Sequence, residues 1–473
     1  MKHPVFYLTI LAVYFVFLII IGFWTQRKNQ SSSDYLIGGR KIGAMVSALS
    51  FVAAYFSSVV IIGGGAFGYK YGLSTLWIAA INVLLGCFLA WLVLGKKTRE
   101  LTKKYNAVTL PDFFAKRYQL PLARIFVSIV ICLFLIIYNV SILKGLGDTF
   151  QVLLGIDYIW GVVISGLIVL IYVSFGGYLA VVWTGFIQAL IMGAGLLLLL
   201  TNTLRVTGGL SAGVLALKNI KPGLVETPGV WGFPGLISYV LVVSFGVWGM
   251  PQMLARFYSI KSNKAIRTGT IIATIGGAMA FIPYLVGALA RTKFPDLANI
   301  DQAIPLMVSN FMSPTATAIF FIGVIAAGMS TFSSVLIISS GAMVSDLMKK
   351  SFSLKINEKQ EIRWNTFTNM LIGLISILIA LKPPGLVLTL TAFSWAVIAS
   401  TCLAPFLLGL YWKRTSQSGV LASMFGGFIV AIVWTMQKPP PFGLHGFIPG
   451  VAVSFLLLVV VSHFSKKKIA FIE

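Results

Sequence analysis

The sequence predicts an all-α integral membrane protein with about 13 transmembrane helices, and composition, hydropathy and charge placement each support this prediction. Of its 473 residues, 58% are hydrophobic and only 10% are charged, whereas soluble domains contain about 25% charged residues. The mean hydropathy is +0.94. These values exclude a water-soluble enzyme.

The net charge of +24 does not indicate nucleic-acid binding. The basic residues lie in short stretches between long apolar runs, whereas a nucleic-acid-binding protein gathers them on one wet face. We therefore interpret the positive charge as a topology signal of a protein embedded in a lipid bilayer.

Long apolar runs place the individual helices. At about 20 residues per crossing, the candidate spans lie near residues 5–25, 45–66, 74–95, 124–146, 157–175, 180–203, 233–254, 270–290, 315–343, 365–381, 386–410, 418–436 and 448–463. The run 157–203 is nearly continuous, and Phe175-Gly176-Gly177 divides it into two spans. The first run has no basic residue and no cleavage site after it, so we expect a retained helix rather than a signal peptide.

The basic residues decide which end of the protein is cytoplasmic. An odd number of spans puts the two termini on opposite sides of the membrane. Segments on the side of the C-terminus contain 26 of the 36 Lys and Arg residues: 26–44, 96–124, 255–268, 346–364, 411–417 and 464–473. By the positive-inside rule we expect the N-terminus outside and the C-terminus in the cytoplasm, with the protein in the plasma membrane.

Titratable residues are missing from the middle of the predicted spans. All 12 Asp and Glu residues and all three His residues fall in loops or at span ends. The usual parts of a proton relay are therefore missing, as are those of an intramembrane catalytic site, so we predict that the protein is not an enzyme. The cysteines lie in apolar runs, so we expect buried thiols and neither a disulfide nor a metal site: Cys87, Cys132 and Cys402.

Two predicted spans contain sequences that interrupt a helix. The second has Ser57-Ser58 followed by Gly63-Gly64-Gly65, and the seventh has the sequence SFGVWGMP at 244–251. Non-helical backbone at membrane depth is tolerated where it lines a cavity, and its free carbonyls can coordinate a cation. The alternative is that these small residues only allow helices to pack closely.

The spacing of the two interrupted spans predicts an inverted repeat. The seventh span lies five after the second, and because five is odd, spans 2–6 and 7–11 have opposite orientations. This is the layout of a secondary transporter. We therefore divide the chain into a leading helix with its cytoplasmic loop, two five-helix repeats, and two trailing helices with a basic tail: 1–44, 45–205, 232–412 and 413–473.

The ninth span carries a face of hydroxyl groups. Ser330, Ser333 and Ser334 are spaced i, i+3, i+4 and share one face, with Thr331 beside them. Hydroxyl and carbonyl oxygens without a carboxylate suit a hard monovalent cation rather than a transition metal. The alternative is interhelical hydrogen bonding, worth about 0.6 kcal/mol per contact.

Short motifs are distributed along almost the whole chain. They are residues 68–73, 105–113, 327–334 and 408–414, the pairs Gly176-Gly177, Trp183-Thr184 and Trp248-Gly249, and the residues Gln252, Arg256 and Phe257. This set resembles the sodium:solute symporter family. The resemblance implies a leucine-transporter-like core of two inverted five-helix repeats with one leading and two trailing helices, and sodium as the coupling ion without an organic cofactor.

The resemblance also implies which residues bind sodium and solute. The sodium ligands it implies are three carbonyls and two hydroxyls: those of Ala53, Phe56, Ala327, Ser330 and Thr331. The substrate contacts it implies are Ser57, Ser58, Val59 and Val60, with Trp248 and Gln252 opposite. Because Val59 and Val60 replace polar residues that a sugar carrier would use, we do not expect a sugar substrate.

One departure from the family pattern concerns a second ion. Many relatives carry Asp after the Trp-Thr pair, whereas this chain has Gly185, so a second site at Ser333 and Ser334 is doubtful and we expect one sodium per turnover. Lys144, near the outer end of the fourth span, either attracts an anionic substrate or is a snorkelling lysine.

The resemblance favours a small organic anion as the solute. The loop containing Lys96-Lys97 and 105–110 and the late stretch 443–449 look closest to pantothenate and monocarboxylate carriers, followed by proline carriers. We therefore expect sodium-coupled symport by alternating access, with a monomer as the functional unit and no nucleic-acid partner. A proline symporter, a proton-coupled carrier and a solute sensor remain alternatives.

Overall fold

The computed structural model describes residues 4–437 and 439–465. In these residues the secondary structure is helical, with no named strand and one isolated parallel bridge between Ile42 and Ile260. Eleven helical segments of the described chain are long and apolar enough to cross a membrane. An all-α membrane fold is therefore confirmed, while the count of thirteen crossings stays a prediction.

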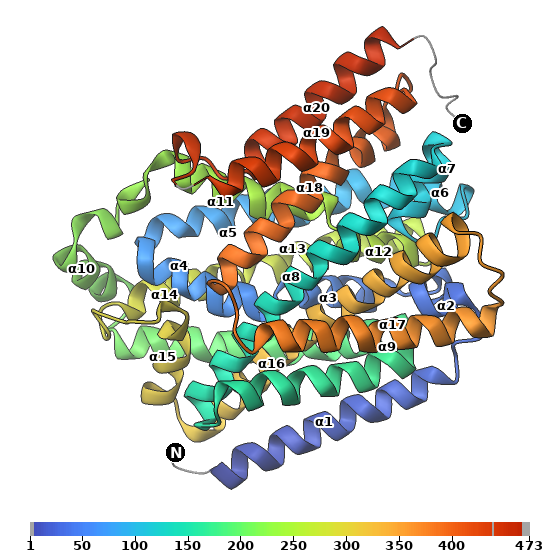
Figure 1. Ribbon diagram of the computed structural model, residues 1–473. Helices are drawn as coiled ribbons and strands as arrows, with labels where there is room; N and C mark the ends of the chain where they lie inside the picture. The colour runs from blue at the N-terminus through green and yellow to red at the C-terminus, as the bar shows by residue number, and fades with distance from the viewer. Residues whose placement is uncertain (1–3, 438, 466–473) are drawn as a thin grey trace.

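The first helices form one side of the molecule. Helix α1 (Pro4–Gln26) is the leading span and packs along α9 (Tyr158–Val206) (Figure 1). The short α2 (Ser32–Ile37) follows, and a capping box fixes its start, because Ser31 and Asp34 each accept a hydrogen bond from the backbone N–H of the other.

The second predicted span is three helical pieces, not one. They are α3 (Ala44–Tyr55), the π-helix η2 (Val59–Gly63) and α4 (Gly64–Tyr71). The third span then runs without interruption through η3 (Gly72–Thr75), α5 (Leu76–Asn82), η4 (Val83–Leu94) and α6 (Gly95–Lys104). The cytoplasmic-loop helix α7 (Leu110–Tyr118) and the fourth span, α8 (Pro121–Leu154), complete this part.

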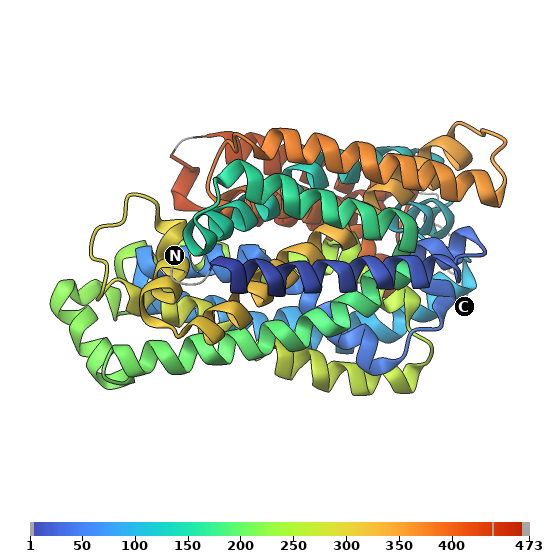
Figure 2. The same ribbon diagram turned by 90° about the horizontal axis from the view of Figure 1, so that it is seen from below.

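Helix α9 contains the fifth and sixth predicted spans. A straight helix of its 49 residues would measure about 74 Å at 1.5 Å per residue, far more than the roughly 30 Å hydrocarbon core. Gly177 has φ 58° and ψ −155°, a conformation that glycine adopts readily. The chain reverses there, and the two halves run in opposite directions (Figures 1 and 2), as the predicted break at 175–177 requires.

The second half of the chain also begins with an interrupted span. Its pieces are α11 (Gly232–Gly246), the 3-10 helix η7 (Val247–Gly249) and α12 (Pro251–Ser259). Further helices follow in order: α13 (Asn263–Ala278), α14 (Phe281–Ala290), α16 (Pro314–Gly341) continued by the π-helix η9 (Ala342–Ser351), α17 (Glu358–Ala380) and α18 (Val387–Tyr411). The predicted trailing pair is α19 (Gln417–Met436) and α20 (Phe447–Phe464), which pack against each other and α18.

Several short helices lie between the spans. They are η1 (Gly38–Arg40), α10 (Leu210–Ile220), η5 (Pro222–Leu224), η6 (Gly229–Trp231), η8 (Ile300–Gln302), α15 (Ala303–Phe311) and η10 (Pro441–Gly443). Helix α16 is the centre of the fold, because it packs on α9, α8, α17 and α3 and nearly all its side chains are buried. Hydroxyl groups on α16 must therefore find partners inside the protein.

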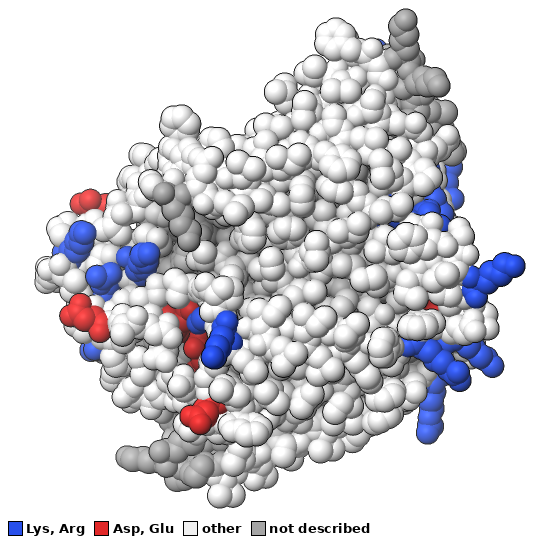
Figure 3. Space-filling model, viewed as in Figure 1, with Lys and Arg blue, Asp and Glu red and all other residues white. Residues whose placement is uncertain are grey.

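Charged side chains divide between the two ends of the molecule. Figure 3 shows Lys and Arg at the end that carries α2, α6 and α7, whereas both signs of charge occur at the opposite end. An uncharged band separates the ends in this view, as expected of a surface that faces lipid.

Candidate functional site

The break in the second span lies at Phe56 and Ser57. Phe56 has φ −83° and ψ 66°, so the helix ends there and the carbonyls of its last turn lose their helical partners. These oxygens carry the negative end of the helix dipole. The glycine triplet is helical instead, and a Cβ at Gly65 would lie 2.5 Å from Ile304, so the triplet allows close packing.

Hydroxyls of α16 meet the free end of α3. The Ser330 hydroxyl donates to the carbonyls of Ala53 and Ala327, both at 2.8 Å. The Thr331 hydroxyl donates to the carbonyls of Ala54 at 2.9 Å and of Ala327 at 3.2 Å. All of these residues are buried.

This group of oxygens fits sodium chemically. A hydroxyl oxygen carries two lone pairs besides its proton, so rotation of either O–H bond turns a lone pair toward a cation that the same carbonyls also coordinate. The structure thus brings together Ala53, Ala327, Ser330 and Thr331. Phe56 directly follows the last residue of α3, and its role as a ligand stays a prediction. Sequence reasoning missed Ala54, since a backbone carbonyl has no signature in the sequence.

The doubtful second ion site has competing contacts. The hydroxyls of Ser333 and Ser334 donate to the Ser330 carbonyl at 2.9 and 2.8 Å. Ser334 also accepts a hydrogen bond from Arg256 Nη2 at 2.7 Å. A second sodium ion here would face a guanidinium charge, which disfavours it. At Gly185 an added Cβ would lie 3.0 Å from the Ser50 hydroxyl, so the position is crowded as well.

A small cavity lies at the same break. Its volume is about 20 Å³, room for about one water molecule, so the space is closed in this conformation. Three predicted substrate residues line it: Ser57, Val59 and Val60. The other lining residues are Tyr55, Tyr138, Val242, Val243, Tyr284, Leu388, Thr391, Ala392 and Trp395.

The remaining predicted substrate residues do not line this cavity. The Ser58 hydroxyl donates to the Ile142 carbonyl of α8 at 3.0 Å. The Trp248 indole N–H donates to the Leu85 carbonyl of η4 at 2.9 Å. Gln252 is buried, and neither atom of its amide has a hydrogen-bond partner among the described residues.

Aromatic residues of the cavity were missed by sequence reasoning. Tyr138 and Trp395 pack edge to face with ring centroids 5.8 Å apart, and both lie in the middle of predicted spans. Tyr and Trp prefer the membrane interfaces, where one end of the ring is wet. Their position at mid-span is therefore a signal that could have identified them.

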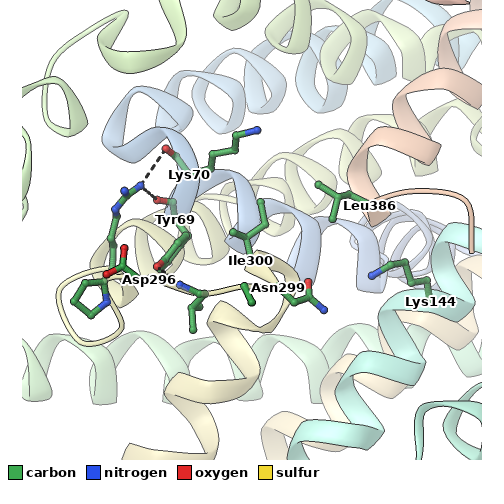
Figure 4. A pocket seen from close by; sticks show the side chains of 11 residues that line it. Tyr69, Lys70, Lys144, Asp296, Asn299, Ile300 and Leu386 are labelled. Atoms are coloured by element: carbon green, nitrogen blue, oxygen red, sulfur yellow. Dashed lines mark hydrogen bonds between the residues drawn. The ribbon is translucent and has the colours of Figure 1, made fainter.

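Lys144 lies in a buried ion-pair group that neither sequence interpretation anticipated. Its ammonium contacts Asp148 at 2.7 Å and Asp301 of η8 at 2.8 Å. It is 8% exposed, so it does not snorkel, and two carboxylates neutralise it, so it is not free to attract an anion. Lys144 forms one side of a pocket of about 640 Å³, with Tyr69 and Lys70 of α4 on the other (Figure 4).

The opposite end of the molecule has its own charge cluster. Buried Asp112 of α7 pairs with Lys116 at 3.0 Å, Arg124 at 3.2 Å and Lys350 of η9 at 2.9 Å. Burial raises the pKa of the Asp112 carboxyl, but the Lys350 and Lys116 ammonium groups outweigh it, so the net shift of the pKa is downward. The ionised carboxylate therefore ties α7 to η9 and α8.

The described residues offer no metal cluster and no disulfide. No group of three His, Cys, Asp or Glu side chains comes together in the described part of the chain. The three cysteines are free, and the structure confirms the prediction that they are buried.

Comparisons with solved structures confirm the fold class. A Na+-coupled sialic acid symporter in a substrate-bound outward-open state has a TM-score of 0.83 at 17% identity, covering 98% of this chain and 99% of that one. Mhp1, a nucleobase-cation-symport-1 family transporter in a closed conformation, has a TM-score of 0.58 at 14% identity, covering 93% and 97%. The predicted leucine-transporter-like fold is therefore confirmed.

Sequence comparisons show the family. The sodium/pantothenate symporter of Escherichia coli (strain K12) is 33% identical, with 96% of this chain and 95% of the relative covered. The osmoregulated proline transporter OpuE of Bacillus subtilis (strain 168) is 30% identical, with 97% and 94% covered. The family model of the sodium:solute symporter family matches residues 35–427. The chain thus belongs to the sodium:solute symporter family, whose members are transporters rather than enzymes.

Proposed function

We propose that this sodium:solute symporter carries a small organic carboxylate, with a monocarboxylate or pantothenate-like anion as the favoured substrate. Sodium coupling follows from the family, and the choice of solute is the proposal. One observation carries the mechanism: the hydroxyls of Ser330 and Thr331 contact the broken end of α3, and the same break lines the cavity through Ser57, Val59 and Val60.

An ion site and a solute cavity on one broken helix allow coupling. Sodium bound between α3 and α16 would stabilise the state in which the cavity accepts solute, and one repeat would then rock against the other. The membrane potential supplies about 2.3 kcal/mol per charge per 100 mV, to which the sodium gradient adds. We retain Phe56 as a ligand, one sodium per turnover and a functional monomer as parts of this proposal.

The residues described as lining the cavity carry no charge, so the cavity disfavours a solute whose amine needs an acidic partner. The named solutes of the two relatives above, pantothenate and proline, both contain a carboxylate, but proline also carries a positive amine. The residues described as lining the cavity include no Asp or Glu to pair with an amine. Val59 and Val60 likewise argue against a sugar, which needs hydrogen-bond partners.

The distribution of basic residues supports the proposed orientation. Helix α1 begins at the end with charges of both signs, and α20 finishes toward the basic end (Figures 1 and 3). By the positive-inside rule the basic end faces the cytoplasm of a plasma membrane, with the N-terminus outside. We also keep the division into 1–44, 45–205, 232–412 and 413–473.

Uptake into proteoliposomes tests the proposal. Labelled pantothenate, pyruvate, lactate, acetate and proline are each supplied with an inward sodium gradient, an inward proton gradient or neither. We expect accumulation of one of the carboxylates other than proline, and only under the sodium gradient. Accumulation of proline alone would overturn the substrate, and accumulation driven by protons would overturn the ion.

A further inference from the structure

Arg256 of α12 is a buried cation without an acidic partner. It is 1% exposed and forms no ion pair with a described residue. Its Nη2 donates to the Ser334 hydroxyl at 2.7 Å, and its guanidinium lies 5.2 Å from the centre of the Tyr178 ring. Nε and Nη1 have no hydrogen-bond partner among the described residues. A buried charge of this kind is costly unless an anion neutralises it.

The surroundings of Arg256 differ from those of the buried Lys144. Lys144 is held by two carboxylates, whereas Arg256 has no carboxylate partner among the described residues. Gln252 lies one turn before Arg256 on α12, so the two side chains share a face of the helix. It is also 1% exposed, and both atoms of its amide lack a partner in the described chain. Unpartnered polar atoms therefore come together on this face of α12.

This face lies between the sodium site and the basic end of the molecule. Ser334 is one turn of α16 beyond Ser330, and Ser47 of α3 donates to the Arg256 carbonyl at 3.4 Å. The chain neighbours of Ser47 and Tyr178, which are Val46 and Leu179, line a pocket of about 280 Å³ whose wall includes Lys28, Lys41 and Asp34. A solute leaving the cavity toward the basic end would therefore pass this face of α12.

We propose that Arg256, together with Gln252 and Ser334, is a second carboxylate-binding site, which the substrate occupies after it leaves the central cavity and before it reaches the cytoplasm. Three guanidinium N–H groups, one on Nε and two on Nη1, can donate charge-assisted hydrogen bonds to the carboxylate. The Gln252 amide N–H can donate as well. This proposal rests on the proposed function, because it assumes that the substrate is a carboxylate.

Transport by three variants tests the inner site. Arg256→Gln should lower uptake of the accepted carboxylate by about tenfold or more, the usual effect of losing a charged hydrogen bond. Arg256→Lys should lose less, because it keeps the charge but not the planar donors. Arg267→Gln, which removes an exposed arginine of α13, is the matched control and should transport as the wild type does. Uptake by Arg256→Gln equal to that of the control overturns the site and leaves the proposed function standing.

Sodium binding gives a readout that needs no substrate. Arg256 and a bound sodium ion would repel each other across one helical turn, so Arg256→Gln should bind ²²Na⁺ about threefold or more tightly in purified protein. Arg256→Lys should bind it as the wild type does. This measurement also shows that the variants are folded. If Arg256→Gln bound sodium with the affinity of the wild type, the result would contradict the proposed placement of the Arg256 charge next to the sodium site.

Direct binding separates this proposal from the proposed function. Binding of labelled pyruvate and of labelled pantothenate to purified protein is measured in the absence of any ion gradient. Binding that is weaker in Arg256→Gln than in the wild type supports the inner site, even where the uptake assay fails. Equal binding by both proteins, or binding by neither, overturns it.

Discussion

At the scale of single residues, two hydroxyl groups join the halves of the proposed sodium site. Among the proposed sodium ligands, Ser330 and Thr331 are the ones that the sequence can reveal. They bind through side-chain hydroxyls, which stand out among the apolar residues of a membrane-spanning helix. Their partners, Ala53 and Ala54, contribute backbone oxygens. Such carbonyls become available only because α3 ends, which depends on the tertiary structure around Phe56.

Replacing both hydroxyls should weaken sodium binding before it weakens folding. In Ser330→Ala/Thr331→Ala we expect the sodium concentration for half-maximal uptake to rise by about tenfold or more, because two oxygen ligands are lost. Ser376→Ala is the matched control, since the Ser376 hydroxyl is buried and donates to the Ile372 carbonyl of its own helix. A double variant with the wild-type sodium response would refute the site.

Lys144 illustrates what sequence reasoning could not supply at this scale. Its neighbour Asp148 is four residues away and could have been paired with it from helical spacing alone. Asp301 is 157 residues away, in a short helix that could not be predicted from the sequence. The sequence therefore reveals at most one of the two carboxylates that neutralise the lysine.

At the scale of elements, long apolar spans and the glycine pair that reverses α9 were predictable, whereas exact breaks and short helices were not. The break in the second span lies before the glycine triplet and not within it. Gly63, Gly64 and Gly65 instead allow close packing against α18, α14 and α15. Helices α10 and α15 have 11 and 9 residues. Such lengths fall well below the roughly 20-residue window that finds a span.

The contact between η8 and α8 should close the outer side of the cavity. Asp301 accepts hydrogen bonds from Lys144 and, at 3.5 Å, from the backbone N–H of Val387. Leu386 lines the large pocket and Leu388 lines the small cavity, so this contact stands between the two. Asp301→Asn should therefore loosen the closure.

Labelling of a cysteine measures that closure. In a background without the native cysteines, Leu388→Cys should react several-fold faster with an impermeant maleimide from outside when Asp301→Asn is also present. Asp296→Asn is the control, because Asp296 lines the same pocket without an ion pair to a described residue. Equal labelling of all three proteins would show that the contact does not close the path.

At the scale of the whole molecule, the same broken helix contributes to both the proposed ion site and the proposed solute cavity. The end of α3 provides carbonyls to α16, and the residues just beyond it line the cavity. Composition and charge placement were sufficient to predict the membrane fold, because both follow from the bilayer as solvent. The closed cavity could not be predicted, because it depends on how side chains from α3, α8, α11, α14 and α18 meet.

Reciprocal binding tests this shared helix most directly. The affinity of purified protein for ²²Na⁺ is measured with and without saturating substrate, and the affinity for substrate with and without saturating sodium. Linkage requires both ratios to be equal, and we expect a factor within the usual range of about 5- to 150-fold. Ratios of one, meaning that sodium and substrate bind independently, would contradict coupling through the broken helix.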